Sequence, residues 1–471
     1  MKVIPIVAEP AASATTASLY ASEKKIYPRR VAGLFARWRW AFVWITQIVF
    51  YGLPWLQWGQ RQAVLFDLGA RRFYLFGFVL YPQDFIYLTG LLVMSALALF
   101  LFTAVAGRLW CGFACPQTVY TEMFLWIEHQ VEGDRLKRMK LDASPWSGRK
   151  VARKGLKHLL WALLAAWTGF TFVGYFTPIT ELGMAAMSAR MGAWELFWVA
   201  FYGLATYGNA GFLREQVCKY MCPYARFQSA MFDKDTLIVS YDAGRGEPRG
   251  SRARKADAKS LGLGSCIDCT LCVQVCPAGI DIRNGLQYEC ISCGLCVDAC
   301  NDVMDKMNDA RGLIRFTTQT ALGSGRGRSD PMGRLLRPRV LVYAAILLVL
   351  TIGVMASLAL RTPLKVDVVR DRAALSRIVA GGNIENVYRL QIMNATERPQ
   401  RYRVQPSGLE GLVIASEREF DVGPADARWV AVRLQAPYES SAPGSHPIQF
   451  DVGTMGDDAH VREKSVFLVP R

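Results

Sequence analysis

Eight of the twelve cysteines lie in two short runs whose spacing is suited to iron–sulfur chemistry. The first run reads C-x2-C-x2-C-x3-C-P from Cys266 to Pro277, and the second reads C-x2-C-x2-C-x3-C from Cys290 to Cys300. Three thiolates of one run bind three corners of a cubic cluster, and the other run supplies the fourth. We therefore predict two [4Fe–4S] clusters, the first held by Cys266, Cys269, Cys272 and Cys300, and the second by Cys290, Cys293, Cys296 and Cys276.

A pair of structural zinc sites is the alternative for these runs, because C-x2-C pairs also bind zinc. Zinc rarely needs a third cysteine two residues further on, and both runs have one, which favours clusters. Asn301 stands where the first run has Pro277, and this difference removes no sulfur. The pattern as a whole is that of a dicluster ferredoxin domain, which we place at residues 245–322.

The other four cysteines form two copies of the motif C-x3-C-P, at Cys111–Cys115 and at Cys218–Cys222. Residues four apart share a helix face, so each pair offers two sulfurs in one direction, and the proline favours ending the helix there. Soft thiolates select Cu(I), zinc or iron–sulfur centres. We predict that the pairs meet as a four-sulfur copper or redox site at the membrane surface. Structural packing, or contact with a second subunit in a homodimer, is the alternative.

Other ligands for copper or haem are few. Met184, Met187 and Met191 share a helix face and offer thioethers to Cu(I), although such a stripe is usually apolar packing. The four histidines all lie outside the apolar stretches, so none of them can hold a haem inside the membrane. The chain has no P-loop and no G-x-G-x-x-G that opens a helix after a strand, so no nucleotide site is evident.

Long apolar stretches must place these cysteines at a membrane. Hydrophobic residues make up 52% of the chain although 20% of its residues are charged, which is typical of membrane spans that alternate with soluble segments. Stretches of about 20 apolar residues can cross the hydrocarbon core. We predict five transmembrane helices, at Trp40–Trp58, Phe85–Ala106, Leu159–Thr177, Trp194–Phe212 and Val340–Leu360.

The distribution of basic residues predicts the orientation of these spans. Arg108–Lys157 contains ten Lys and Arg residues, whereas Gly59–Asp84 contains three and Pro178–Ala193 contains one. Basic loops stay in the cytoplasm, so the N-terminus and every cysteine should be cytoplasmic and the C-terminus periplasmic. The net charge of +16 is explained by this asymmetry, and we expect no nucleic-acid partner.

The last hundred residues have the composition of a β domain without cysteine. Short alternating runs at Val387–Ile392, Arg401–Val404, Trp429–Leu434 and His446–Val452 are separated by Gly, Pro and Asp, which predicts an immunoglobulin-like β-sandwich. The predicted organisation is a disordered cytoplasmic tail (1–37), a four-helix membrane region (38–244), the ferredoxin domain (245–322), a linker (323–339), a fifth helix (340–360) and the sandwich (361–471).

Three further stretches, together with the two cysteine runs, carry a resemblance to a known family. They are WCGFACPQTVYTE at Trp110–Glu122, KYMCPYARFQSAMFDKDTLIVSYD at Lys219–Asp242 and RGLIRF at Arg311–Phe316. In these the chain resembles the CcoG/FixG/RdxA family of cytochrome c oxidase accessory proteins, over nearly its whole length. The resemblance implies a protein of the bacterial inner membrane that takes part in the assembly of cbb3-type oxidase.

The same resemblance implies a cupric reductase that supplies Cu(I), with oxidase subunits or copper chaperones as partners. A cytoplasmic electron donor would reduce the two clusters, and electrons would pass to copper at Cys111, Cys115, Cys218 and Cys222. Two alternatives stay open: a quinol-linked electron conduit, and a copper-handling scaffold whose clusters are structural.

Overall fold

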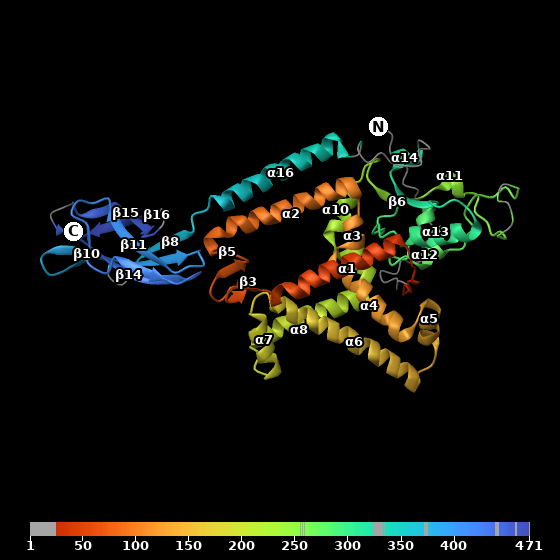
Figure 1. The fold of residues 1–471 in the computed structure, drawn as a ribbon, viewed down its shortest axis with the longest axis horizontal. Coiled ribbons are helices and arrows are strands. Elements are labelled where there is room, and N and C mark those ends of the chain that lie inside the picture. The colour runs from red at the N-terminus through yellow and green to blue at the C-terminus, as the bar shows by residue number, and fades with distance from the viewer. Residues whose placement is uncertain are drawn as a thin grey trace, which may run out of the picture.

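The computed structural model describes residues 25–470 except 255, 257, 259, 324–332, 334, 372–374, 439–441 and 457–458. The molecule is elongated (Figure 1). The cysteine-rich region lies at one end, the long helices in the middle and a β domain at the other end.

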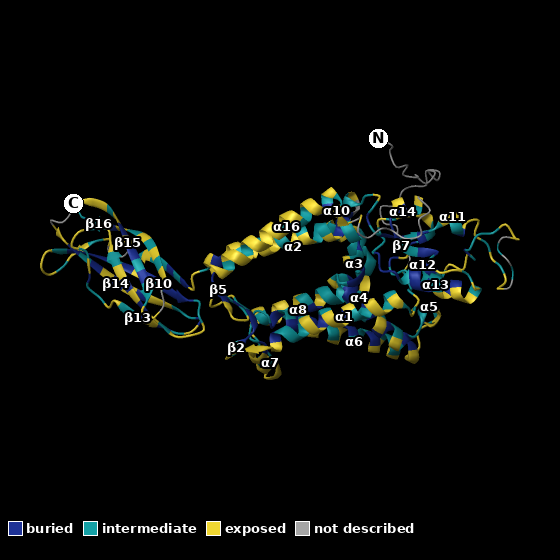
Figure 2. Ribbon diagram, turned by 45° about the horizontal axis from the view of Figure 1, so that its top comes forward, coloured by how far each residue is buried: buried dark blue, intermediate teal, exposed yellow. Residues whose placement is uncertain are grey.

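The long helices are α1 (Leu34–Gly52), α2 (Phe85–Ala106), α6 (Gly148–Val173), α8 (Ala193–Gly208) and α16 (Pro338–Ala359). Within the part of the chain that the structure describes, three helical segments are long and apolar enough to cross a membrane: Pro82–Ala106, Gly148–Val173 and Pro338–Ala359. Most residues along α2 and α16 are exposed (Figure 2), as expected of surfaces that face lipid.

The predicted first span is helical but displaced toward the N-terminus, beginning at Leu34 and not at Trp40, and the fourth is helical over its whole predicted length. The first ends at Gly52 instead of Trp58, because Pro54 lies in a 3-10 turn and Gln57–Trp58 form strand β1. The fourth, α8, has 16 residues and continues into the π-helix Asn209–Leu213. The predicted bounds of the first span were therefore wrong, those of the fourth agree with the helical stretch, and the count of five stays a prediction.

Close backbone contact joins the helices into pairs. Gly169 of α6 lies so near α8 that a Cβ atom there would be 2.3 Å from the Val199 carbonyl oxygen, which only glycine permits. On the other side of the molecule Tyr87 of α2 lies 3.1 Å from the Ser357 hydroxyl of α16.

Shorter helices connect these spans to the cysteines. They are α3 (Leu109–Phe113), α4 (Pro116–Glu132), α5 (Arg135–Ala143), α7 (Ile179–Met187), α9 (Arg214–Gln216), α10 (Pro223–Met231), α11 (Ala243–Gly246), α12 (Leu271–Gln274), α13 (Leu295–Met307) and α14 (Gln319–Gly323).

A buried carboxylate, Glu128, joins the α4, α5 and α6 helices. It lies 3.2 Å from Arg138, 3.1 Å from Arg214 and 3.9 Å from Lys157. Burial by itself would raise the pKa of Glu128, but the charges of Arg214, Arg138 and Lys157 outweigh it and hold that pKa below its ordinary value.

The cysteine-rich domain is larger than predicted. Strand β6 (Ile238–Tyr241) pairs antiparallel with β7 (Ile314–Thr317), and Val239 and Tyr241 belong to the same buried core as Cys266 and Cys272. A start at residue 245 therefore cuts off one strand of the domain. The strand is four residues long and follows the second C-x3-C-P motif, so the hydropathy pattern gave no sign of its distant partner.

The predicted disordered tail, 1–37, is also wrong for residues 25–37. Asp298 at the start of α13 accepts hydrogen bonds from the backbone N–H groups of Phe35 (3.3 Å) and Ala36 (2.8 Å). The Tyr27 hydroxyl donates to Asp142 over 2.6 Å, and the Arg29 N–H donates to the Gln274 carbonyl. This segment therefore holds the cysteine-rich domain against the helices. Residues 1–24 lie outside the described part of the chain, as does most of the predicted linker, 323–339.

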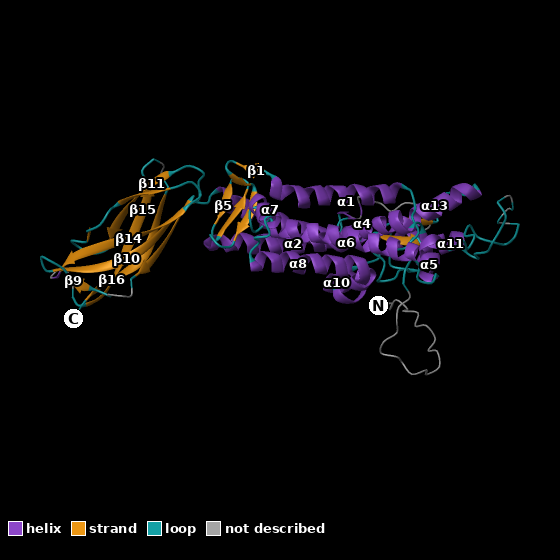
Figure 3. Ribbon diagram, turned by 90° about the horizontal axis from the view of Figure 1, so that it is seen from below, coloured by secondary structure: helices purple, strands orange, loops and turns teal. Residues whose placement is uncertain are grey.

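The β domain consists of two antiparallel sheets that enclose one core (Figure 3). One sheet has the order β12-β14-β10-β8, with β9 beside β10, and the other has the order β13-β11-β15-β16. The rings of Tyr388 and Phe450, from opposite sheets, are 5.0 Å apart. The four predicted strands lie within β10, β11, β14 and β15. The strands are β8 (Leu364–Arg370), β9 (Arg377–Ile378), β10 (Asn383–Asn394), β11 (Gln400–Ser407), β12 (Val413–Ile414), β13 (Glu419–Val422), β14 (Ala427–Pro437), β15 (Gly444–Thr454) and β16 (His460–Val469).

Small sheets between α1 and α2 hold the β domain to the helices. They comprise β1 (Gln57–Trp58) with β2 (Arg61–Gln62), and β3 (Val64–Asp67), β4 (Arg72–Leu75) and β5 (Phe78–Leu80). Arg72 forms an ion pair with Asp426 at 2.7 Å, and Tyr81 donates to the Asn394 carbonyl over 3.0 Å. These contacts fix the β domain at one end of the spans.

Candidate functional site

The eight cysteines of the two runs line two adjoining cavities. The first cavity is lined by all four cysteines predicted for the first cluster, with Ile314 of β7 and the preceding Leu313 beside them. The second cavity is lined by Cys276, Cys290, Cys293 and Cys296. Cys272 lines both cavities, so the two sites are neighbours.

The two loops share an unusual backbone that turns the cysteines inward. Asp268 and Ser292, one residue before Cys269 and Cys293, have φ values of 53° and 52°. Two residues later Thr270 and Gly294 have φ values of 57° and 75°, and each begins a helix, α12 or α13. Left-handed residues are rare outside glycine, so their repetition at matching positions marks a conformation that the site requires.

The surroundings of these sulfurs suit metal thiolates. Burial raises the pKa of Cys272 to about 11, of Cys276 to about 12 and of Cys300 to about 12, so the free thiols stay protonated at neutral pH. A bound metal centre supplies the charge that stabilises the thiolate form. Eight sulfurs around two cavities fit clusters in which each iron takes one thiolate.

The two C-x3-C-P pairs lie together next to the second cavity. Cys115 and Cys222 are the N-cap residues of α4 and α10, with their prolines at the first helical position. The pKa of Cys111 is raised to about 12 and that of Cys218 to about 11. Burial is the largest cause, and the charges of cysteines in both pairs add to it. Gln117 joins the two segments, since its side-chain amide donates to the carbonyls of α9 and the preceding π-helix.

Helix α3 presses the first of these pairs against the loop of the second run. A Cβ atom on Gly112 would lie 2.7 Å from the Ile291 carbonyl oxygen and 2.9 Å from the Cα atom of Cys293. Glycine is therefore required at this position for the two backbones to touch. The residue next to it, Cys111, is thereby held beside the ligand loop of the second cavity.

Two buried arginines, which the sequence reading missed, hold this junction together. Arg108 donates to the carbonyls of Tyr288 and Ala225, and so bridges the loop before Cys290 and the helix after Cys222. Arg39 lies between Glu122, at 2.7 Å, and the thiol of Cys293. Arg108 was counted only among the basic residues that predict orientation, and Arg39, just before the predicted first span, was given no role.

Met184 and Met187 do not take part in this junction. Met184 is 60% exposed and Met187 is 85% exposed on α7, at the opposite end of α6 from the cysteines.

Comparison with protein families finds three matching models. Residues 213–319 match a family described as "4Fe-4S dicluster domain", and residues 88–133 match one described as "4Fe-4S binding domain". Residues 354–470 match a family described as an IG-like fold at the C-terminus of FixG. The two iron–sulfur matches contain all twelve cysteines.

Known proteins align with nearly the whole chain. "Nitrogen fixation protein FixG" of Rhizobium meliloti is 37% identical over 450 residues, which covers 88% of this chain and 85% of the relative. "Protein RdxA" of Cereibacter sphaeroides is 39% identical over 441 residues, covering 91% of this chain and 92% of the relative. "Protein RdxB" of the same organism is 38% identical, covering 85% and 86%.

Proposed function

Because the chain belongs to the FixG/RdxA family of iron–sulfur membrane proteins, we propose that it is a cupric reductase that delivers Cu(I) for assembly of a cbb3-type oxidase. The observation that carries this proposal is the contact between Gly112 and the Cys293 loop, which places the C-x3-C-P thiols beside the second cluster cavity. A one-electron donor and a soft ligand set for copper are thereby neighbours.

Electron balance is simple in this scheme. Cu(II) takes one electron and becomes Cu(I), with no bond to carbon made or broken and no proton required. Each cluster, when bound by its four cysteines, stores and releases one electron. The protein's own groups hold the clusters, bring Cys111 and Cys218 to the metal ion, and balance charge through the buried guanidinium of Arg108.

The membrane arrangement is part of the proposal. Five spans, with the N-terminus and cysteine-rich domain in the cytoplasm, would put the β domain in the periplasm. Its sheet order, β12-β14-β10-β8 against β13-β11-β15-β16, supports an immunoglobulin-like sandwich. There the domain could meet oxidase subunits or a copper chaperone, while the clusters receive electrons on the opposite side.

The test is reoxidation of the reduced clusters by Cu(II). Protein purified without oxygen should contain about eight irons per chain if both clusters are [4Fe–4S]. After reduction with dithionite, its clusters should be reoxidised by Cu(II) with one Cu(I) formed per electron. Clusters that stay reduced in the presence of Cu(II) would refute the reductase. Copper transfer that persists after Cys269→Ser and Cys293→Ser would indicate a scaffold.

A pair of variants tests where copper binds. Cys111→Ala with Cys218→Ala should lower Cu(I) affinity at least tenfold while the iron content stays the same. Met184→Leu with Met187→Leu is the matched control, because these sulfurs lie far from the junction and are exposed. If the affinity falls only in the methionine variant, copper binds at α7 instead.

A further inference from the structure

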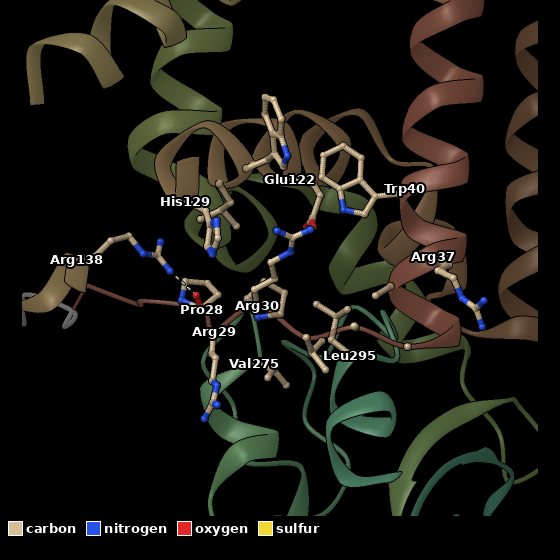
Figure 4. A pocket seen from close by; sticks show the side chains of 17 residues that line it. Pro28, Arg29, Arg30, Arg37, Trp40, Glu122, His129, Arg138, Val275 and Leu295 are labelled. Carbon is tan, nitrogen blue, oxygen red and sulfur yellow. Dashed lines mark hydrogen bonds between the residues drawn. The ribbon is translucent and has the colours of Figure 1, made fainter. Parts of the chain in front are cut away.

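A cavity of the described structure lies outside both cysteine groups. It has a volume of about 700 Å³ and is enclosed by the N-terminal segment, helix α4 and the cysteine-rich domain (Figure 4). This volume is in the range of small-molecule binding sites. Its walls combine apolar residues, among them Trp40 and Leu295, with four arginines, Glu122 and His129.

A few polar groups point into this cavity. Figure 4 shows the imidazole of His129 and the side chain of Arg30 directed toward its centre, near Glu122. The Nδ1 atom of His129 is buried and finds no hydrogen-bond partner among the residues that the structure describes. Burial and the neighbouring charges of Arg30 and Arg138 lower the pKa of His129, against the opposite effect of Asp134, so the ring is neutral and able to accept a proton.

The cavity shares a wall with the second cysteine group. Val275 and Pro277, which line it, are the neighbours of Cys276 in the chain, and Leu295 precedes Cys296. On the same side Arg39 connects Glu122 to Cys293. A ligand in the cavity would therefore be separated from the second cluster by little more than one layer of residues.

The cavity also lies where the first proposed span begins. It lies at the start of α1, where the apolar stretch of that helix begins, and the rings of Trp40 and Trp126 are 6.3 Å apart. Trp126 is 46% exposed. Tryptophan is enriched where a membrane protein meets the headgroup layer, so a ligand dissolved in the bilayer could reach this site.

We propose that this cavity binds a membrane hydroquinone and is the electron-input site for the clusters. The inference rests on the proposed function and names the class of its electron donor. Oxidation of one hydroquinone to quinone breaks two O–H bonds and releases two electrons and two protons. The two clusters take one electron each. His129 accepts the two protons one after the other, one with each electron transferred, and passes each to solvent on the cytoplasmic side.

A nucleotide donor fits the cavity less well. The phosphates of a dinucleotide need free cations, yet Figure 4 shows Arg29 and Arg37 pointing away from the cavity. Arg138 is held by the Pro28 carbonyl and Glu128. Only Arg30 remains directed inward, which is too little charge for a pyrophosphate.

Binding is tested first, without turnover. Decylubiquinone titrated calorimetrically into the purified holoprotein in detergent should bind at a single site. Ala32→Trp, which adds bulk at the cavity wall where the backbone is exposed, should weaken binding at least tenfold. Iron content shows whether this variant keeps its clusters. Binding that is absent, or equal in the variant, would overturn the proposal.

Electron transfer is tested by mixing oxidised protein with decylubiquinol and following the clusters by electron paramagnetic resonance. His129→Gln should slow cluster reduction about 100-fold, as expected for loss of a general base, while quinone affinity changes less than threefold. His446→Gln, on the β domain, is the matched control and should match the wild type. Reduction by NADH but not by the quinol would overturn the proposal.

The cupric reductase activity can be tested separately from the hydroquinone site. Dithionite-reduced protein bypasses the cavity, so its reoxidation by Cu(II) reports on the proposed function alone. If dithionite-reduced protein reduces Cu(II) and decylubiquinol does not reduce the clusters, the hydroquinone site is wrong and the reductase stands.

Discussion

Replacing Gly112 with alanine tests the contact through which the second cluster would reach the C-x3-C-P thiols. The added Cβ atom would lie 2.7 Å from the Ile291 carbonyl oxygen and 2.9 Å from the Cα atom of Cys293. Both neighbours are backbone atoms, so a side-chain rotation cannot relieve the conflict. To reach the ordinary contact distance of 3.4 Å, helix α3 and the loop must separate by about 0.7 Å.

The loss of stability and the change in rate both follow from this displacement. Overpacking of this kind destabilises by about 1–3 kcal/mol, which a folded membrane domain can tolerate. A misplacement of about 1 Å between reacting groups can lower a rate about 100-fold, so we expect Cu(II) to reoxidise the reduced clusters roughly tenfold more slowly. The measurement is stopped-flow absorbance of dithionite-reduced protein mixed with Cu(II).

Gly155→Ala is the matched control for this experiment. Gly155 lies in helix α6 with open space around it, so a Cβ atom there meets no other atom within 4 Å. Its substitution should leave the rate unchanged and stabilise the helix by about 1 kcal/mol. A Gly112→Ala protein that keeps its iron and reacts at the wild-type rate would refute the role of this contact. A slow variant that has lost iron would instead locate the damage in the ligand loop.

Further predictions concern how the domains are held together. Asp298→Ala removes the hydrogen-bond acceptor at the start of α1 and should lower the stability of that contact by about 1 kcal/mol. The measurement is limited proteolysis, in which residues 25–33 should be cut faster. Asp302→Ala, at an exposed position of α13, the helix that also carries Asp298, is the control and should be cut at the wild-type rate. Glu128→Gln leaves buried cations unpaired and should lower stability by about 3–5 kcal/mol, measured by thermal unfolding in detergent. The pKa of Glu128 is lowered in the folded protein, so its contribution to the free energy of unfolding is present above pH 4.5 and is lost as the pH falls through the folded-state pKa. An acid unfolding transition that is identical in Glu128→Gln and in the wild type would contradict this. Arg72→Ala should loosen the β domain without changing iron content, and hydrogen exchange near Asp426 should rise.

The sequence by itself predicted the features that depend on local spacing. Ligand spacing within a cluster loop is set over a few residues, so the two sets of four cysteines could be read directly and then found around two cavities. The bounds of α2 follow from an unbroken apolar run, and they agree with the structure at Phe85 and Ala106. Alternation of apolar and polar residues located four of the β-domain strands in the same way.

Only the tertiary structure decided which distant segments meet. The contact of Gly112 with the Cys293 loop joins residues about 180 positions apart, and the cavity near His129 is closed by three separate parts of the chain. Periodicity describes which face of an element is apolar but not which other element covers it. For that reason the sequence did not predict several features that help to place the cysteines. These are the docked segment 25–37, strand β6 and the buried Arg39 and Arg108.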